Sequence, residues 1–404
     1  MTEIFLRSTR HSYPSDPVQK RFEAAVYNTG NYFFEEAVAS HMPYLEVHNT
    51  LEGLPQNITR LVLSMSNFIS PAADLTGWCE ELESRKIDQM VMIGAGAQAY
   101  RYDDGIELKK ETRRFLDLLS HKSISIGVRG FYTAEILNDF GIKNIEVIGC
   151  PTAFWNDFPD VRPFNGSASG EPRLAIHCTP DGNFRDAVGA LFKHGFEYRA
   201  DYIVQSEGWM MPYILPDMPS LREQYETDTH SRYYTHGYLS HDQFESWMRG
   251  HAQIYFGMTS WIEAMKGYDF VYGSRFHGNM AAIMAGTPAL NMPFDTRTRE
   301  MVEYLNLPHI PLEDFRAGFS LEELAGYADF SLFKASYPLL RERYISFLSR
   351  NGLEFGRKIE SRAQRVKQNY LDHLEQIASQ IDVPPSLLER EAKLRRRNEA
   401  VSIL

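Results

Sequence analysis

The sequence of 404 residues contains only three cysteines, Cys79, Cys150 and Cys178, and no two of them form a CxxC pair. Such a sparse and odd set excludes a disulfide framework and a cysteine-rich zinc site, and it is typical of a reducing compartment. Positive charge is also scarce, because 42 Lys and Arg residues stand against 53 Asp and Glu residues, a net charge of −11. This balance argues against broad electrostatic binding to nucleic acid, which needs a basic face.

Long apolar runs are missing as well. No stretch of 18 apolar residues occurs, and the N-terminal sequence MTEIFLRSTRHSYPSD has no apolar signal core. We therefore expect a cytoplasmic protein without a membrane span. A basic run near the end, formed by Arg390, Lys393 and 395–397, fits either a solvated helix face or contact with the inner face of an anionic membrane.

Short apolar runs alternate with segments of helical period through most of the chain, and hydrophobic residues make up 43% of it, as in globular proteins. The runs that predict buried strands are 61–65, 90–93, 123–128, 145–148, 173–177, 201–205, 252–256, 270–273 and 289–292. Strand–helix alternation predicts parallel sheets covered by helices. The expected fold class is α/β, with two Rossmann-like domains facing each other across a cleft in a GT-B-like arrangement, and with long C-terminal helices.

The strand–helix pattern stops at DVRPFNGSASGEP, a stretch rich in Gly, Pro and Ser. We therefore predict an N-terminal domain over 1–160, a linker over 161–172, a C-terminal domain over 173–335 and a helical extension over 336–404. The segment 208–238, rich in Pro, Tyr and Met, is expected to form an irregular insertion. Ligands of open α/β sheets bind at the carboxyl ends of the strands, so reactive residues are sought there.

The strongest candidate is the turn between the strand at 270–273 and a small-residue helix that ends at Gly286. It reads Ser274-Arg275-Phe276-His277-Gly278-Asn279. The helix N-terminus favours an anion, Arg275 adds a bidentate donor, and His277 adds a group that exchanges protons near neutral pH. Gly278 is expected to let the backbone approach a ligand closely. The plainer alternative is that Arg275 pairs with a carboxylate and His277 only satisfies the turn.

A second arginine stands at the corresponding place in the first domain. Arg129 follows the strand at 123–128 and precedes a helix closed by Gly141. Arg129 and Arg275 are therefore expected to face one cleft and to hold a ligand with more than one anionic group, although a single Arg at a strand end is often structural.

Two further loops lie at the same edge of the predicted sheets. Gly94 and Gly96 follow the strand at 90–93 and fit either a phosphate cradle or a tight turn. Asp295 and Arg297 follow the strand at 289–292 and fit either a ligand pocket or, as we favour for Asp295, the cap of the next helix. No His, Cys or carboxylate cluster at ligand spacing predicts a metal.

These motifs resemble those of the polysaccharide pyruvyl transferases. In that family a strand leads into Arg-x-His-[Gly/Ala] and a small-residue helix ending in Gly-x-Pro, which here reads SRFHGNMAAIMAGTP. An upstream Arg before a helix matches VRGFYTAEILNDFGI, and Asn-x-Gly-[Asn/Asp] matches Asn28-Thr29-Gly30-Asn31. The chain departs from the family at Gly130, where an acidic residue is usual, and at Cys150-Pro151-Thr152-Ala153, where Asp-Pro-Ala is usual.

The resemblance implies transfer of a pyruvyl group from phosphoenolpyruvate to two hydroxyls of a sugar, in a surface polysaccharide or its lipid-linked precursor, with release of phosphate and without cofactor or metal. It implies that His277 is the acid and that Arg275 and Arg129 hold the anionic groups. The residues expected near the donor are Ser274, Gly278, Asn279, Gly94, Gly96, Asp295 and Arg297. Those expected near the acceptor are Asn28, Gly30 and Asn31.

Other functions stay open at this point. A nucleotide-sugar glycosyltransferase or epimerase has the same architecture, and there Glu300 would hold the ribose. A non-catalytic binding protein of this fold is a further alternative, which the presence of both arginines and the histidine disfavours. The insertion carries aromatic residues that fit either stacking on sugar rings or simple packing, namely Trp209, Tyr213, Tyr233 and Tyr234.

Overall fold

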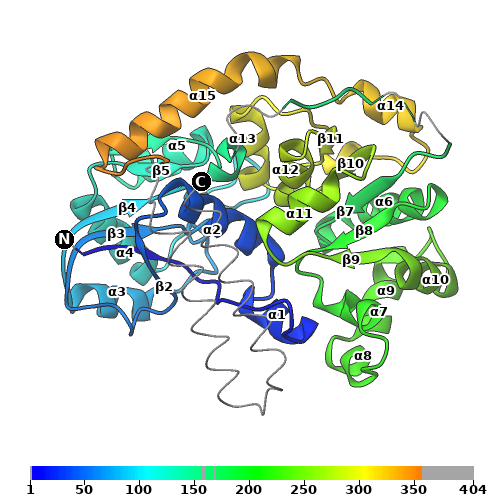
Figure 1. Ribbon diagram of the computed structural model, residues 1–404, viewed down its shortest axis with the longest axis horizontal. Helices are drawn as coiled ribbons and strands as arrows, with labels where there is room; N and C mark the ends of the chain where they lie inside the picture. Colours follow the sequence, from blue (N-terminus) through cyan, green and yellow to red (C-terminus); the bar gives the residue numbers. More distant parts are fainter. Residues whose placement is uncertain (1, 156–159, 165, 167–169, 357–404) are drawn as a thin grey trace, which may run out of the picture. The chain divides into compact units, whose positions relative to one another are not determined.

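The computed structural model describes residues 2–155, 160–164, 166 and 170–356, and these contain two main parallel β-sheets (Figure 1). The expected helices and basic run beyond residue 356 lie outside the described residues. We call residues 2–155 the first half and residues 170–330 the second half. Among the described residues no strand ladder joins the sheet of one half to that of the other.

The sheet of the first half has the strand order β2-β1-β3-β4, and every pair is parallel. A short parallel pair, β5-β6, continues it, because the Gly94 and Ala95 amides donate to the Gly127 carbonyl. The strands are β1 (Glu3–Leu6), β2 (Glu46–His48), β3 (Asn57–Leu63), β4 (Lys86–Met92), β5 (Ile126–Val128) and β6 (Ile145–Val147). The helices are α1 (Val18–Ala24), α2 (Thr29–His41), α3 (Thr76–Glu83), α4 (Lys110–Lys122), α5 (Phe131–Asp139) and the 3-10 turn η1 (Pro151–Phe154).

The sheet of the second half has the order β11-β10-β7-β8-β9 and is also entirely parallel. Its strands are β7 (Leu174–His177), β8 (Asp201–Val204), β9 (Ala252–Ile254), β10 (Phe270–Gly273) and β11 (Ala289–Asn291). Outside the insertion at 208–238, its α-helices are α6 (Arg185–Glu197), α10 (His241–His251), α11 (Met258–Met265), α12 (Phe276–Met284), α13 (Thr296–Tyr304) and α14 (Leu321–Gly326), and α15 (Ser331–Arg350) follows. The short turns are η2 (Gly182–Phe184) and η4 (Leu312–Asp314).

The predicted fold class, α/β with two Rossmann-like halves, is confirmed by these sheets. The strands β1 and β2 were not predicted, because four and three residues are too few to show a period. Ser260 and Glu263 have the spacing of a capping box, which predicts a helix start at Ser260, but this prediction is wrong. The helix α11 begins earlier, at Met258, and the Ser260 hydroxyl donates back to the Gly257 carbonyl at 3.0 Å.

The insertion is more regular than expected. It folds into η3 (Gly208–Met210), α7 (Met211–Ile214), α8 (Ser220–Gln224) and α9 (Thr227–Thr235). Trp209, Tyr213 and Tyr234 are buried in the core of the second half, where Trp209 and Tyr213 pack against Phe244 of α10 and Tyr234 stacks on Trp209. Their packing role is therefore clear, and only Tyr233 is left exposed among the aromatic residues considered for sugar stacking.

One hydrophobic core extends through both halves. It contains Phe5 and Val91 from the first sheet and Val271 from the second, and it also takes in residues of α2, α11, α12 and α15. The helix α15 reaches the first half, where Asn351 at its end donates to the Ser125 hydroxyl at 2.9 Å. Burial of apolar side chains in this shared core therefore holds the two halves together. The domain boundaries at 160, 172 and 335 remain predictions.

Within the described part of the chain, every helix is too short or too polar to cross a lipid bilayer.

Candidate functional site

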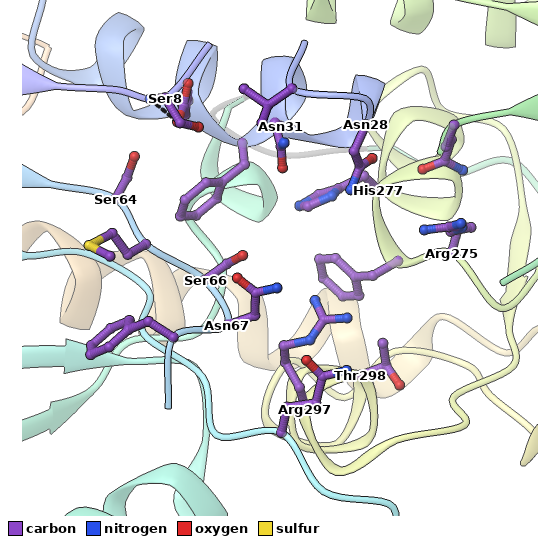
Figure 2. A pocket seen from close by; sticks show the side chains of 18 of the residues that line it. Ser8, Asn28, Asn31, Ser64, Ser66, Asn67, Arg275, His277, Arg297 and Thr298 are labelled. Carbon is purple, nitrogen blue, oxygen red and sulfur yellow. Dashed lines mark hydrogen bonds between the residues drawn. The ribbon is translucent and has the colours of Figure 1, made fainter. Parts of the chain in front are cut away.

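A cavity of about 570 Å³ lies where the two halves meet (Figure 2). Its walls come from segments that follow β1, β3 and β4 in the first half and β7, β8, β10 and β11 in the second, together with the start of α2 and Trp78 of α3. This is the carboxyl edge of both sheets, where open α/β folds bind ligands. The predicted residues that line it are Asn28, Asn31, Ser274, Arg275, His277 and Arg297.

Arg275 is fixed by several hydrogen bonds before any ligand arrives. It is the N-cap residue of α12, its Nε donates to the Cys178 carbonyl at 3.1 Å, and its Nη2 bonds to the Ser206 hydroxyl and the Glu207 carboxylate. Glu207 is buried, and its other oxygen accepts from the Gln205 amide at 2.8 Å. The carboxylate partner considered in the sequence analysis therefore exists, and it aims the guanidinium that lines the cavity.

His177 also holds the turn that begins at Ser274 and Arg275. This buried residue ends β7, and its Nδ1 accepts from the Arg275 amide at 3.2 Å while its carbonyl accepts from the Ser274 amide at 3.1 Å. Burial first, and then Arg275, lower the pKa of His177 to about 3, so its ring is neutral. Neither Glu207 nor His177 was predicted, because they lie 68 and 98 residues away from Arg275 in the chain.

Gly278 has a different purpose from the one predicted. A Cβ at this position would lie 2.4 Å from Cδ2 of His177, so the glycine makes room for that ring and not for a ligand. Asn279 is buried behind the wall, where its Nδ2 donates to the Gly273 carbonyl at 2.9 Å. Ser274 lines the cavity and accepts from the Thr179 amide at 2.7 Å.

His277 lies in a pocket formed mainly by the first half. Its ring centroid is 6.1 Å from that of Phe33 and 6.2 Å from that of Phe34, and its Nε2 is 3.9 Å from Cys150 Sγ. A Cβ at Gly30 would lie 2.9 Å from its Nδ1. Burial lowers the pKa of His277 well below the usual range, and the positive charges of the Arg129, Arg297 and Arg275 guanidiniums lower it further. The imidazole is therefore neutral at pH 7.

Arg129 stands behind the cavity wall, which differs from the expectation that it faces the cleft. It is completely buried, its Nε donates to the Gly94 carbonyl at 2.8 Å, and its guanidinium lies 4.8 Å above the centre of the Phe34 ring. Its Nη2 has no hydrogen-bond partner among the described residues. Burial lowers its pKa to about 10, so it still carries a full positive charge at neutral pH.

Arg297 takes the place on the wall that was expected for Arg129. It lines the cavity, its Nη2 is 3.5 Å from Asp295 Oδ2, and its buried Nε is without a partner in the described part of the chain. Asp295 itself caps α13 by accepting from the Thr298 amide at 2.7 Å, which confirms the capping role favoured above.

The glycine loop after β4 packs the two arginines and does not line the cavity. Gly94 has a φ of +77°, which suits glycine, and its carbonyl holds Arg129. A Cβ at Gly96 would lie 3.0 Å from Cγ of Arg297 and 3.3 Å from Cδ of Arg129. The loop therefore acts on a ligand only through these side chains.

The start of α2 serves both as a cap and as cavity wall. Asn28 accepts from the Gly30 amide at 2.9 Å, and Asn31 donates to the Ala25 carbonyl at 3.1 Å. Both side chains line the cavity, whereas Gly30 lies behind them against His277.

Glu300 joins the two halves away from the cavity. This buried carboxylate accepts from the amide and hydroxyl of Thr133, at 2.9 and 2.6 Å, and so stabilises the start of α5. A Cβ at Gly130 would lie 2.5 Å from Cβ of Glu300, so the missing side chain makes room for it. Burial raises the pKa of Glu300 to about 7. Its oxygens are engaged here, which removes the support it gave to the nucleotide-sugar alternative.

One group with metal-ligand spacing occurs in the described residues, although the sequence spacing did not predict it: Asp228, His241 and Glu245 in the insertion region. The Arg222 guanidinium bonds to both of its carboxylates. We interpret the group as an ion-pair cluster.

Comparisons with known proteins agree with the motifs. The family model described as polysaccharide pyruvyl transferase matches residues 28–295. No match was found among curated proteins.

Solved structures resemble the chain only distantly. A functionally uncharacterised protein from Klebsiella pneumoniae is 10% identical, with a TM-score of 0.38 over 75% of this chain and 87% of its own. A putative UDP-N-acetylglucosamine 2-epimerase from Listeria monocytogenes is 11% identical, with a TM-score of 0.34 over 80% and 73%. An Anabaena protein in complex with UDP and glucose is 8% identical, with a TM-score of 0.37 over 93% and 100%.

The Glu300→Gln variant should change how stability depends on pH. Because the pKa of Glu300 is raised to about 7 from 4.5, its contribution to stability is fully present below pH 4.5 and is lost as pH rises toward 7. The neutral amide avoids this loss. Thermal unfolding from pH 4.5 to 8 should show the variant gaining stability over the wild type until about pH 7 and then keeping a constant advantage. If the stability of the two proteins changed with pH in the same way, the raised pKa of Glu300 would be contradicted.

The Gly278→Ala variant should be destabilised, by about 1–3 kcal/mol, because the methyl group overpacks against the His177 ring. The control is Gly77→Ala in α3, where a Cβ meets nothing within 4 Å, and this change should stabilise slightly. Urea denaturation measures both. Equal effects of the two substitutions would show that Gly278 is not needed for space.

Proposed function

Because the chain belongs to the polysaccharide pyruvyl transferase family, we propose that it transfers a pyruvyl group from phosphoenolpyruvate to two hydroxyls of one sugar and releases phosphate. The observation that supports phosphoenolpyruvate as the donor is the cluster of arginines around the His277 imidazole. Arg275 and Arg297 line the cavity and Arg129 stands behind them, and all three lower the pKa of His277. In a chain of net charge −11, such a cluster is suited to a small ligand with several negative charges.

The two anionic ends of the donor match the two arginines that line the cavity, Arg275 and Arg297. Phosphoenolpyruvate carries a carboxylate and a phosphate, and Glu207 holds the Arg275 guanidinium in place at the cavity wall. Arg297 offers an Nε that has no protein partner in the described residues. Arg129 adds attraction through its charge without contacting the donor. We assign no metal or cofactor to this reaction.

The chemistry consists of two additions to one carbon. Protonation of the methylene carbon of phosphoenolpyruvate leaves a cationic centre at the carbon that carries the phosphate. The first sugar hydroxyl adds there and loses its proton. The phosphate then leaves with the electrons of its C–O bond, and the second hydroxyl adds and loses its proton to complete the ketal. One proton is thus consumed, and two are released, one of which the departing phosphate takes up.

His277 is the residue we propose for the proton transfers. The free site keeps its imidazole neutral, since burial and three guanidiniums oppose a further positive charge. A bound trianion brings negative charge beside the imidazole and raises the pKa of His277 again. Donor binding therefore brings a proton to the imidazole, which then donates it to carbon and later accepts one from a hydroxyl.

A saccharide acceptor and a cytoplasmic location belong to the same proposal. A nucleotide-sugar enzyme is the alternative, and phosphate release from phosphoenolpyruvate, against cleavage of a nucleotide sugar, separates the two.

Arg275→Ala should weaken phosphoenolpyruvate binding roughly tenfold to hundredfold, because a charge-assisted pair contributes about 1.5–3 kcal/mol. Removing Arg275 also leaves Glu207 buried without its partner, so Arg297→Ala is measured beside it and should weaken binding similarly. Calorimetric titration with phosphoenolpyruvate gives both values. The control is Arg350→Ala, which removes a surface ion pair with Glu146 and should leave affinity unchanged. Wild-type affinity in both cavity variants would exclude these arginines from the donor site.

His277→Gln should keep phosphoenolpyruvate binding and lose roughly 10²–10⁴-fold in turnover, since the amide cannot carry a proton. Binding by calorimetry and phosphate release at saturating donor are measured together. Weaker binding with normal turnover would make His277 a donor ligand and not the acid. Unchanged values for both would leave it the structural role of satisfying the turn.

A further inference from the structure

The two halves contribute walls of different chemistry to the cavity. The charged lining residues of the second half are Asp181, Arg275 and Arg297, together with His277. Apart from Glu35, the first half lines the cavity with hydroxyl and amide side chains and with apolar ones, namely Leu6, Val26, Phe34, Met65, Phe68 and Trp78. In Figure 2, Ser8, Ser64, Ser66 and Asn67 lie on the side opposite Arg275, with His277 and Arg297 between.

We call the hydroxyl and amide side chains with which the first half lines the cavity the polar wall; it includes Ser64, Ser66 and Asn67, and it offers no charged group to a ligand. Among its described lining residues only Glu35 is ionisable. One Glu35 oxygen accepts from the amide and hydroxyl of Ser8, at 2.8 and 2.7 Å, and the other accepts from those of Thr9, at 2.9 and 2.5 Å. Four donors therefore saturate this carboxylate, and no cation stands on this wall to pair with an anionic ligand.

Ser64 supplies the observation that points to a ligand. Its side chain is buried directly after β3 and lines the cavity, yet its hydroxyl has no hydrogen-bond partner among the described residues. Buried hydroxyls are nearly always paired, because an unpaired one costs free energy. The amide of Asn67 lies on the same loop and is exposed. Together they offer donors and acceptors to a ligand rich in hydroxyl groups.

Trp78 gives the same wall an apolar surface. It comes from α3 and is half-buried, and its ring stands nearly perpendicular to the Phe115 ring, with the centroids 6.2 Å apart. An indole combines a large apolar face with one polar N–H group. A pyranose presents the matching combination, with C–H groups on a face and hydroxyls around its edge.

The polar wall begins directly beside the donor residues. A Cβ at Gly96 would lie 2.9 Å from the Ser66 carbonyl oxygen and 3.0 Å from Cγ of Arg297. The loop of Ser64 to Phe68 and the proposed donor site are therefore neighbours within one cavity, so a hydroxyl held by the loop can reach a carbon held near Arg297.

We infer that Ser64, Ser66, Asn67 and Trp78 form the acceptor subsite and that it takes an uncharged sugar residue. This inference rests on the proposed function and makes it more specific. A uronic acid would bring its carboxylate to a wall without a cation and beside Glu35, which costs desolvation energy without return. A nucleotide diphosphate is disfavoured there for the same reason.

The test uses tryptophan fluorescence with a panel of methyl pyranosides as probes. The panel contains the glucoside, galactoside, mannoside and both N-acetylated amino sugars of the gluco and manno series, with the glucuronide as charged counterpart. At least one neutral glycoside should give a saturable change, and the glucuronide should bind at least tenfold more weakly. Failure of every neutral glycoside, or preference for the glucuronide, overturns the inference.

Variants locate the binding. Trp78→Phe should abolish the fluorescence change while saturation-transfer NMR still detects the glycoside, and Ser64→Ala should lower affinity about 3- to 10-fold. Tyr233→Ala, which removes the exposed aromatic of the insertion, is the control and should change neither signal. The assignment of the acceptor subsite is overturned if the Trp78 and Ser64 substitutions leave glycoside binding and its fluorescence signal unchanged, or if the Tyr233 substitution weakens binding.

The donor is measured separately, so that the two proposals fail separately. If the wild type does not bind phosphoenolpyruvate but binds a neutral glycoside through Ser64, the donor proposal fails and the acceptor subsite stands. If phosphoenolpyruvate binds and no glycoside does, the acceptor subsite fails alone.

Discussion

The site depends on keeping three guanidinium groups close together in a partly buried place. Like charges repel more strongly there than in water, so each arginine must be held by contacts that the fold provides. Arg129 has the Gly94 carbonyl and the face of Phe34, Arg275 has Glu207, and Arg297 has Asp295. Arg275 and Arg297 each have a carboxylate partner, whereas no ion pair of Arg129 occurs among the described residues, so the cluster keeps an excess of positive charge. The glycines at 94 and 96 and the caps of α12 and α13 follow from this requirement.

The site also requires both halves at once. His277 belongs to α12 of the second half, but Phe33, Phe34 and Cys150 of the first half form its surroundings. Glu300 reaches in the same direction and completes the start of α5. The continuous apolar core holds the two halves in the relative position that these contacts require. Separating the two halves would expose this apolar core and, at the same time, open the pocket around His277.

Sequence reasoning located the residues that stand at strand ends and missed those that act across the chain. Arg275, His277 and Arg297 follow strands, and local pattern alone placed them at the cavity. Glu207 and His177 have no local signal, because their importance comes from a partner far away in the sequence. Glu300 was considered as a ribose ligand only under the nucleotide-sugar alternative. Its hydrogen bonds to Thr133 and the space left by Gly130 show that this α13 residue stabilises the start of α5. Ser64 to Phe68 form no motif, so the polar wall became visible only in three dimensions.

The neutral imidazole surrounded by arginines has a consequence for the ions around the protein. Neutral histidine is the commonest ligand of transition metals, and phosphoenolpyruvate in a cell meets abundant Mg²⁺. The guanidiniums of Arg129, Arg297 and Arg275, which lower the pKa of His277, also disfavour a divalent cation at its ring. Under the proposed function, this charge favours the free donor anion over its magnesium complex and leaves the imidazole available for proton transfer.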